Sequence, residues 1–141
     1  MMSEAVLFLC NRNAIRSPMA AVLLNHLNGE DCQAESAGIT PGDADPLSQA
    51  ALGELGLAIP EGPRPVEAVK LGRFDLIVAL SPQAQHRALE LTRNTGTAVE
   101  YWPVADPSLV DGNREQRLAA YREVRDGLLK KLKERFKTAN S

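Results

Sequence analysis

The sequence predicts an α/β fold, a three-layer sandwich in which a four-stranded parallel sheet carries helices on both faces. Short apolar segments of strand length alternate with helix-like segments four times along the 141 residues. The connections between them are suited to right-handed crossovers, which lay successive strands parallel to one another. In a sheet of this kind, ligands bind at the carboxyl ends of the strands.

The first strand is predicted at residues 5–9, where five consecutive apolar residues have the length and bulk of a buried strand. Ser17-Pro18 then begins a helix, because proline suits the first helical turn and apolar residues follow at helical spacing. Asn28-Gly29 ends this helix. Residues 10–16 are therefore a loop between a buried strand and a helix N-terminus.

The remaining elements follow the same alternation. Asp45-Pro46 and Ser81-Pro82 mark two further helix starts, since a capping side chain precedes proline in each. The predicted set is a strand at 32–38, helices at 46–55 and 65–71, a strand at 75–80, a helix at 82–91, a strand at 97–101 and a closing helix at 113–137. Six residues of the closing helix are expected to face the core: Leu118, Tyr121, Val124, Leu128, Leu132 and Phe136.

Length and composition restrict the class of protein. A chain of 141 residues is expected to form one domain whose core needs no disulfide or metal. The 16 basic and 18 acidic residues are nearly balanced, so no nucleic acid or membrane partner is expected. The apolar runs are too short to span a membrane, and Met1-Met2-Ser3-Glu4 lacks the basic start of a signal peptide, which predicts a cytoplasmic location.

The loop after the first strand has the features of an anion site. It aims backbone N–H groups and the positive end of a helix dipole at one point. That field favours the ionised form of the Cys10 thiol, which is the nucleophilic form. Arg16 adds a planar fork that matches phosphate oxygens. The predicted phosphate-binding residues are Asn11, Arg12, Asn13, Ala14, Ile15 and Arg16.

This loop also resembles that of a known family. Leu9-Cys10-Asn11-Arg12-Asn13-Ala14-Ile15-Arg16-Ser17-Pro18-Met19-Ala20 resembles the phosphate-binding loop of the low-molecular-weight protein tyrosine phosphatases and of the arsenate reductases that share their fold. Ser36-Ala37-Gly38, the strand beginning Phe74-Asp75, and Asp106-Pro107 extend the resemblance over nearly the whole chain. It implies a single phosphatase-like domain over residues 1–141.

The chemistry expected of such a loop is hydrolysis of a phosphate monoester through a phosphocysteine. Cys10 attacks phosphorus in line, Arg16 and the loop amides hold the oxygens, and the Ser17 hydroxyl stabilises the thiolate. The resemblance implies that Asp106 is the general acid and that Asn13 braces the loop. The expected partners are a phosphorylated protein or small phosphate ester, and phosphate or other oxyanions in the loop.

Three departures from the family pattern affect the substrate. Arg12 replaces a loop glycine and adds charge at the mouth of the site. Ile15 replaces the second loop cysteine of many members, which removes an in-loop disulfide. Ser108-Leu109-Val110 stands where eukaryotic-type members place tyrosines that hold an aromatic substrate. Tyr101 or Trp102 is an alternative aromatic wall, although both residue types are more often core.

Two alternative functions are compatible with the same loop. One alternative is an arsenate reductase or arsenate–thiol transferase in which Cys10 works with a small external thiol. Thioredoxin-coupled reduction needs two more thiols, whereas the chain has only Cys32, expected across the sheet and unable to form a disulfide with Cys10. Another is a non-catalytic module that binds phosphorylated ligands.

His26 is not expected to act as a base for Cys10, because it lies roughly 14 Å along the helix from the loop.

Metals and organic cofactors are not expected. The sequence has no Cys-x-x-Cys pair, no histidine pair at helical spacing, and no glycine-rich nucleotide loop. Four further carboxylates have no support comparable to that of Asp106, namely Asp43, Asp45, Asp75 and Asp111.

Overall fold

The computed structural model describes residues 4–136 and confirms the predicted three-layer α/β sandwich. All four strands are parallel, in the order β2-β1-β3-β4. The strands are β1 (Glu4–Cys10), β2 (Cys32–Gly38), β3 (Leu76–Ala79) and β4 (Ala98–Tyr101). The helices are α1 (Arg16–Asn28), α2 (Pro46–Gly53), α3 (Pro82–Leu91) and α4 (Arg114–Arg135).

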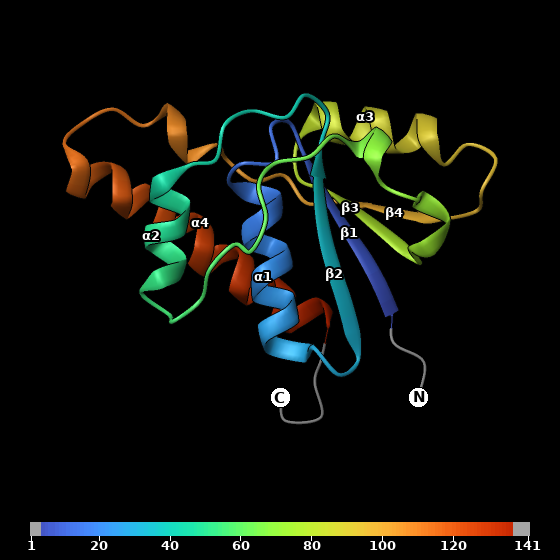
Figure 1. The fold of residues 1–141 in the computed structure, drawn as a ribbon, viewed down its shortest axis with the longest axis horizontal. Coiled ribbons are helices and arrows are strands. Elements are labelled where there is room, and N and C mark those ends of the chain that lie inside the picture. The colour runs from blue at the N-terminus through green and yellow to red at the C-terminus, as the bar shows by residue number, and fades with distance from the viewer. Residues whose placement is uncertain (1–3, 137–141) are drawn as a thin grey trace.

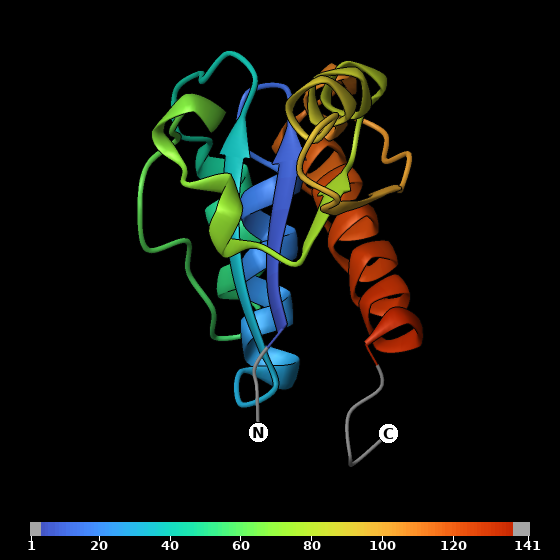
Figure 2. The same ribbon diagram turned by 90° about the vertical axis from the view of Figure 1, so that its right-hand side faces the viewer.

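The helices divide unequally between the two faces of the sheet. Helices α1, α2 and α4 cover one face, and α3 covers the other together with the turns at 66–73 (Figure 1). In the perpendicular view of Figure 2, the strands lie between α1 behind them and these turns in front. A hydrophobic core lies on each face of the sheet, and side chains of β1 alternate between the two. Val6 and Phe8 pack in the core on the α1 face, and Leu7 and Leu9 pack in the core on the α3 face.

The observed elements differ from the predicted ones mainly at their ends. Helix α2 stops at Gly53 because tight turns follow it and Gly56 takes a positive φ of 76°. The helix expected at 65–71 is wrong as a continuous element. Two one-turn 3-10 helices, Val66–Ala68 and Leu71–Arg73, stand there, since the two residues between them are extended.

The closing helix begins and packs as expected. Asn113 caps α4 in a capping box with Gln116. Five of the six residues predicted to face the core are buried, and Val124 is half-buried. Position 137, the expected end of this helix, lies outside the described residues.

The two cysteines lie at opposite ends of neighbouring strands. The register pairs Cys10 with Gly38 and Glu4 with Cys32. Six residues of strand separate the two positions, which corresponds to about 20 Å. Both thiols are free, as expected.

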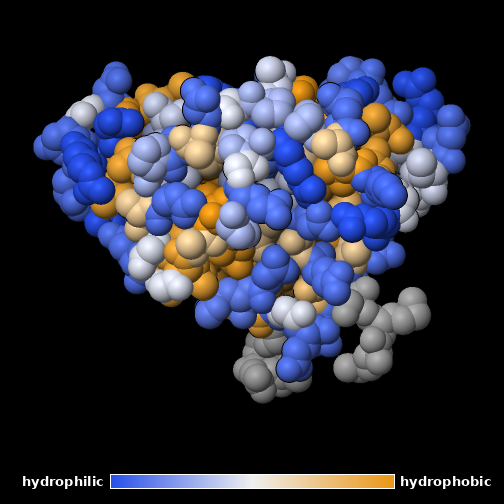
Figure 3. All heavy atoms as spheres, in the orientation of Figure 1, coloured by the Kyte–Doolittle hydropathy of each residue, from blue (hydrophilic) through white to orange (hydrophobic). Residues whose placement is uncertain are grey.

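The face of the molecule seen in Figure 3 is predominantly hydrophilic. Figure 3 shows hydrophilic side chains spread over the face seen in Figure 1, with apolar ones between them over α1 and α2. Within the described part of the chain, no helix has the length and hydrophobicity that crossing a membrane requires.

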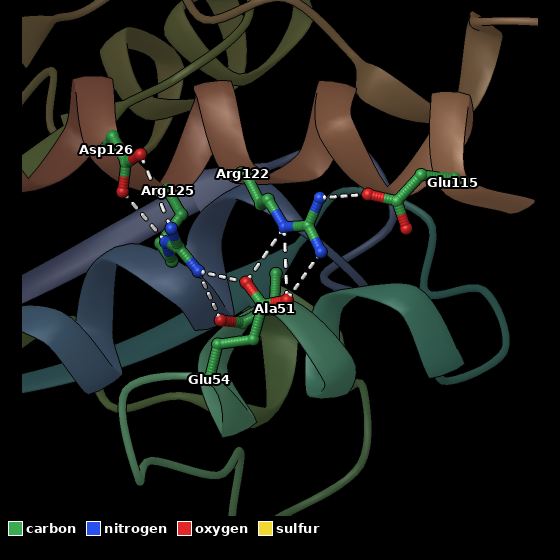
Figure 4. Close-up of polar contacts among 6 residues, drawn as sticks. All are labelled: Ala51, Glu54, Glu115, Arg122, Arg125 and Asp126. Atoms are coloured by element: carbon green, nitrogen blue, oxygen red, sulfur yellow. Dashed lines mark hydrogen bonds and ion pairs between the residues drawn. The ribbon is translucent and has the colours of Figure 1, made fainter.

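A cluster of charged side chains joins α2 to α4 (Figure 4). Arg122 donates to both oxygens of Glu54, at 2.7–3.1 Å, and also to Glu115. Arg125, whose side chain is nearly buried, donates to Glu54 and to the Ala51 carbonyl, each at 2.8 Å. These hydrogen bonds, led by those from Arg122, lower the pKa of Glu54 to about 2.

This shift predicts acid sensitivity. Because the folded-state pKa of Glu54 lies below the ordinary value of 4.5, its ionised form stabilises the fold above pH 4.5, and that stabilisation disappears as the pH falls toward 2. We expect Glu54→Gln to lower the melting temperature at pH 7 and to flatten its decline between pH 4.5 and 2. Circular dichroism melts measure both. Glu134→Gln, an exposed site on α4, is the control, and equal acid sensitivity of the two variants would contradict the assignment.

Candidate active site

A pocket of about 220 Å³ lies at the carboxyl ends of the strands and contains the predicted nucleophile and acid. Three segments that are distant in sequence form it, because parallel strands deliver their following loops to one edge. The lining residues, called the Cys10 pocket below, are Cys10, Arg12, Ala14, Ile15, Arg16, Asp43, Ala44, Asp45, Pro46, Asp106 and Ser108.

The loop after β1 is fixed by its own carbonyl groups. The carbonyls of Cys10, Asn11 and Arg12 accept hydrogen bonds from N–H groups of the segment 39–42, at 2.8–3.0 Å. Within residues 4–136, the amide N–H groups of residues 12–15 donate to no protein acceptor. The loop therefore leaves a row of unpaired donors at the N-terminus of α1, which is the arrangement that binds oxyanions.

Asn13 holds the loop in this shape. Its backbone is left-handed, with a φ of 55°, a conformation that asparagine tolerates better than most residues. Its side-chain amide donates to Ser17 at 2.8 Å and to Ser36 at 2.9 Å. Its carbonyl oxygen accepts from the backbone N–H of Arg64 at 2.9 Å. One buried side chain thus connects α1, β2 and the loop before η1 (Val66–Ala68).

Ser17 is the partner of the thiol. The Cys10 Sγ and Ser17 Oγ atoms are 3.0 Å apart. Because Asn13 donates to this hydroxyl, the Ser17 proton has two acceptors left, Cys10 Sγ and the Ala37 carbonyl at 3.3 Å. A thiolate at Cys10 is the stronger acceptor, so the hydroxyl turns to it and stabilises the negative sulfur.

Arg16 is held from the far side of the pocket. Its Nη1 donates to the Val104 carbonyl at 2.9 Å, and its side chain is nearly buried. The Val104 segment is itself anchored to the end of β3, because Trp102 N–H donates to Ala79 and Val104 N–H donates to Leu80. The guanidinium therefore has a fixed direction, with donors left over for a ligand.

Asp106 lines the same pocket as Cys10, at the sheet edge where both are expected. Its Oδ1 accepts from the Ser108 N–H at 2.9 Å and the Ser108 hydroxyl at 2.7 Å. These bonds belong to the one-turn helix η3 (Pro107–Leu109) that Asp106 caps. One carboxylate oxygen is thus used for positioning, and within residues 4–136 the other accepts no hydrogen bond.

Two more carboxylates line the pocket, which the sequence-based prediction did not include. Asp45 is structural, since it caps α2 through the N–H groups of Leu47 and Ser48 and accepts from the Tyr121 hydroxyl at 2.8 Å. Burial and this hydrogen bond raise the pKa of Tyr121, which stays protonated. Asp43 is exposed. Both follow β2, so their position after a strand end was the signal that could have found them.

The remaining sequence-based predictions fall outside the pocket. Trp102 is buried and packs against Phe8 and Phe136, with ring centroids 6.0 and 6.3 Å apart, so it belongs to the core. Tyr101 is not among the lining residues, and no aromatic side chain of the described chain lines this pocket. His26 lines a separate groove between α1 and β2.

The sequence did not assign a supporting role to several residues around the loop. Ser36 and Arg64 hold Asn13, and the Ser81 hydroxyl donates to the Asn11 side chain at 2.6 Å. Their roles depend on the register of distant strands. As for metals, no group of three or more His, Cys, Asp or Glu side chains converges on one position in residues 4–136.

The close approach of β2 to the loop yields a prediction about Gly38. A Cβ at this position would lie 2.8 Å from the Asn13 nitrogen and 2.9 Å from the Arg12 carbonyl carbon, which are backbone atoms that cannot turn aside. We expect Gly38→Ala to cost about 1–3 kcal/mol of stability and to weaken binding of inorganic phosphate. Urea unfolding and isothermal titration calorimetry measure the two effects.

The matched control is Gly127→Ala in α4, where a Cβ meets no atom within 4 Å. This variant should gain about 0.5–1 kcal/mol, because alanine is the better helix former. Native phosphate affinity in Gly38→Ala would show that the loop does not depend on this contact.

The chain is similar to arsenate reductases and to a phosphatase over nearly its whole length. The chain is 29% identical over 134 residues to an arsenate reductase of Halalkalibacterium halodurans, covering 94% of this chain and 95% of the relative. It is 30% identical to the crystal structure of an arsenate reductase from Archaeoglobus fulgidus, with a TM-score of 0.72 and coverage of 92% and 96%. A low molecular weight protein tyrosine phosphatase from T. tengcongensis shares the fold at 24% identity, with a TM-score of 0.77 and coverage of 95% and 100%.

The family model for the low molecular weight phosphotyrosine protein phosphatases matches residues 5–140. The matched range includes the loop after β1, residues 36–38 at the end of β2, and Asp106. The chain therefore belongs to the low molecular weight phosphotyrosine protein phosphatase family.

Proposed function

We propose that this protein is a phosphatase that hydrolyses phosphate monoesters through a phosphocysteine at Cys10. The observation that carries the proposal is the contact of 3.0 Å between Cys10 Sγ and Ser17 Oγ, in a pocket that also holds Arg16 and Asp106. A phosphorylated protein or a small aryl phosphate is the proposed substrate. The whole chain, residues 1–141, is proposed to act as one phosphatase-like domain.

In the first step, the free N–H groups of the loop and the Arg16 guanidinium bind the three non-bridging oxygens of the phosphate. The Cys10 thiolate attacks phosphorus in line, and an S–P bond forms as the P–O bond to the leaving group breaks. The leaving oxygen takes the electron pair and receives a proton from Asp106. Charge that develops on the phosphoryl oxygens is stabilised by donors already in place.

In the second step, water replaces the sulfur. Asp106, now a carboxylate, accepts a proton from water as the water oxygen attacks phosphorus. The S–P bond breaks, and the sulfur leaves with its electron pair as a thiolate. The Ser17 hydroxyl stabilises that thiolate by the same hydrogen bond that stabilises the resting nucleophile.

The pocket wall informs the choice of substrate. Among the described residues, no aromatic side chain lines it, so a phosphotyrosine ring would contact side chains such as Ala44 and Pro46. Leu109, beside Asp106, is 79% exposed and offers an apolar contact outside the pocket. These features favour aryl phosphates carried on a protein surface or by a small molecule. The pocket offers the aryl ring apolar contacts but no aromatic partner.

Arsenate reduction is the second candidate, because curated relatives with 25–29% identity carry the name arsenate reductase. Cys10 would add to arsenate with loss of water. A small external thiol would then attack the Cys10 sulfur, forming a mixed disulfide and releasing arsenite, so that two electrons pass from the two sulfurs to arsenic. Cys32 does not suit the role of that thiol. It is buried at the other end of the sheet, and burial, with Glu4 and Asp31 nearby, raises its pKa.

Replacement of the nucleophile tests the central step. We expect Cys10→Ser to lose at least about a thousandfold in kcat on p-nitrophenyl phosphate, since a serine hydroxyl is a much weaker nucleophile at neutral pH. Inorganic phosphate should still bind, which calorimetry measures. Cys32→Ser is the matched control and should keep native turnover. Phosphate binding without turnover in the native protein would instead identify a non-catalytic phosphate-binding module.

The general acid has its own signature. Asp106→Asn should slow alkyl phosphates, which have poor leaving groups, far more than nitrophenyl phosphates, because only the former need a proton as the P–O bond breaks. The measurement is kcat/KM across a series of leaving groups. Asp111→Asn, an exposed carboxylate in the following loop, should show native values. A uniform loss over the series would assign the acid elsewhere.

Side-by-side assays separate the two candidate reactions. An aryl phosphate, a phosphotyrosine peptide, and arsenate with glutathione are each incubated with the native protein, with Cys10→Ser as the blank. Release of phosphate that depends on Cys10 supports the phosphatase. Consumption of glutathione that depends on both arsenate and Cys10, without phosphate release from the esters, supports the reductase.

A further inference from the structure

Arg12 occupies a defined place on the wall of the Cys10 pocket. Its carbonyl accepts from the Gly42 N–H at 3.0 Å, which fixes its backbone beside the segment after β2. Its guanidinium lies directly over Gly42, where a Cβ would be 2.5 Å from Nε and 2.7 Å from Nη2. The absence of a side chain at Gly42 thus creates the space in which this cation rests.

The Arg12 guanidinium has no ion-pair partner among residues 4–136. Among the described residues, no carboxylate lies within 4.0 Å of its guanidinium, although three carboxylates line the same pocket. Two of these are engaged elsewhere, Asp45 by α2 and Tyr121, and Asp106 by Ser108. Six other arginines do pair with acids, namely Arg64, Arg73, Arg87, Arg122, Arg125 and Arg135.

The position of this cation suggests what it contacts. Arg12 belongs to the loop that would hold the phosphate, yet its side chain lies on the pocket wall. Arg16, the first residue of α1, already supplies a guanidinium to this pocket. A leaving group that fills the pocket would pass along this wall. A planar guanidinium is matched to a carboxylate, with which it forms two parallel hydrogen bonds.

We propose that Arg12 is a specificity-determining residue that binds a carboxylate on the leaving group of the phosphate ester. The proposal rests on the proposed phosphatase function, and it names the substrate class as aryl phosphates or phosphopeptides whose leaving group carries an acidic group beside the ester. Gly42 is part of the same device, because any larger residue there would displace the guanidinium.

The test compares two esters that differ only in charge. These are 3-carboxyphenyl phosphate and 3-carboxamidophenyl phosphate, with 3-(aminomethyl)phenyl phosphate as a cationic third. We expect the native protein to show a kcat/KM about three- to tenfold higher for the carboxylate than for the carboxamide, the range of a partly exposed charge pair. The preference should shrink as salt is raised.

Two variants remove the cation in different ways. Arg12→Gln deletes the charge, and Gly42→Ala keeps the charge but displaces it. In both, the ratio of the carboxylate to the carboxamide rate should fall to near one whatever the absolute rates, and a native circular dichroism melt shows that the protein has folded. Arg93→Gln, an exposed arginine after α3 at the other edge of the sheet, is the control and should keep the native ratio.

A binding measurement keeps the outcome independent of turnover. Calorimetry measures the binding of 3-carboxybenzyl and 3-carbamoylbenzyl phosphonates. The Cys10→Ser variant should bind the carboxylate more tightly than the carboxamide, and the double variant Cys10→Ser with Arg12→Gln should bind the two equally. If no ester is hydrolysed but this preference appears, the phosphatase function fails and the role of Arg12 stands. A native ratio in Arg12→Gln, or a preference for the aminomethyl ester that depends on Asp43, overturns the proposal.

Discussion

The shape of the loop around Cys10 depends on a single side-chain amide. Asn13 donates to Ser17 and Ser36 and accepts from the Arg64 backbone, so every part of its amide is bonded to a different element. Its backbone bears the one left-handed conformation of a non-glycine residue in the described chain. Because these bonds are buried, breaking any one leaves an unsatisfied polar group, which costs about 1–3 kcal/mol. The site is therefore rigid before any ligand arrives.

The parallel sheet supplies what the loop needs from the rest of the chain. Strand β1 is central, so the segments after β2 and β4 reach it from opposite sides. The segment after β2 takes up the loop carbonyls, while the segment after β4 supplies the carbonyl that orients Arg16. The loop and the Arg16 side chain are thus held in place by the fold, and both line the Cys10 pocket. Such preorganised donors stabilise transition-state charge without further rearrangement.

The two cysteines show how position decides the chemistry of one residue type. Cys10 ends a strand, beside a helix N-terminus and a hydroxyl that stabilises negative sulfur. Cys32 begins a strand, buried near two acidic residues, and its raised pKa keeps it protonated. The family model matches residues 5–140, a range that contains both cysteines. Within this chain only Cys10 lies beside a helix N-terminus, so only Cys10 is proposed as a nucleophile.

The sequence by itself determined most of the elements and the position of the loop after β1. Buried strands, helix caps at Asp45 and Ser81, and the spacing from Cys10 to Arg16 are local patterns, so neighbouring residues are sufficient to specify them. Element ends and the turns at 66–73 were less well predicted, because tertiary contacts decide where a weak helix stops.

Only the tertiary structure decided which residues support the loop. Ser36 and Arg64 lie 23 and 51 positions from Asn13. The register of β2 against β1 brings Ser36 to it, and Arg64 lies against the end of β2, where its carbonyl accepts from the Gly38 N–H. The same holds for Trp102, which the sequence left open between wall and core and which packs on Phe8. Contacts of this kind carry no local signal, because they depend on strand order and register, which are fixed only when the sheet assembles.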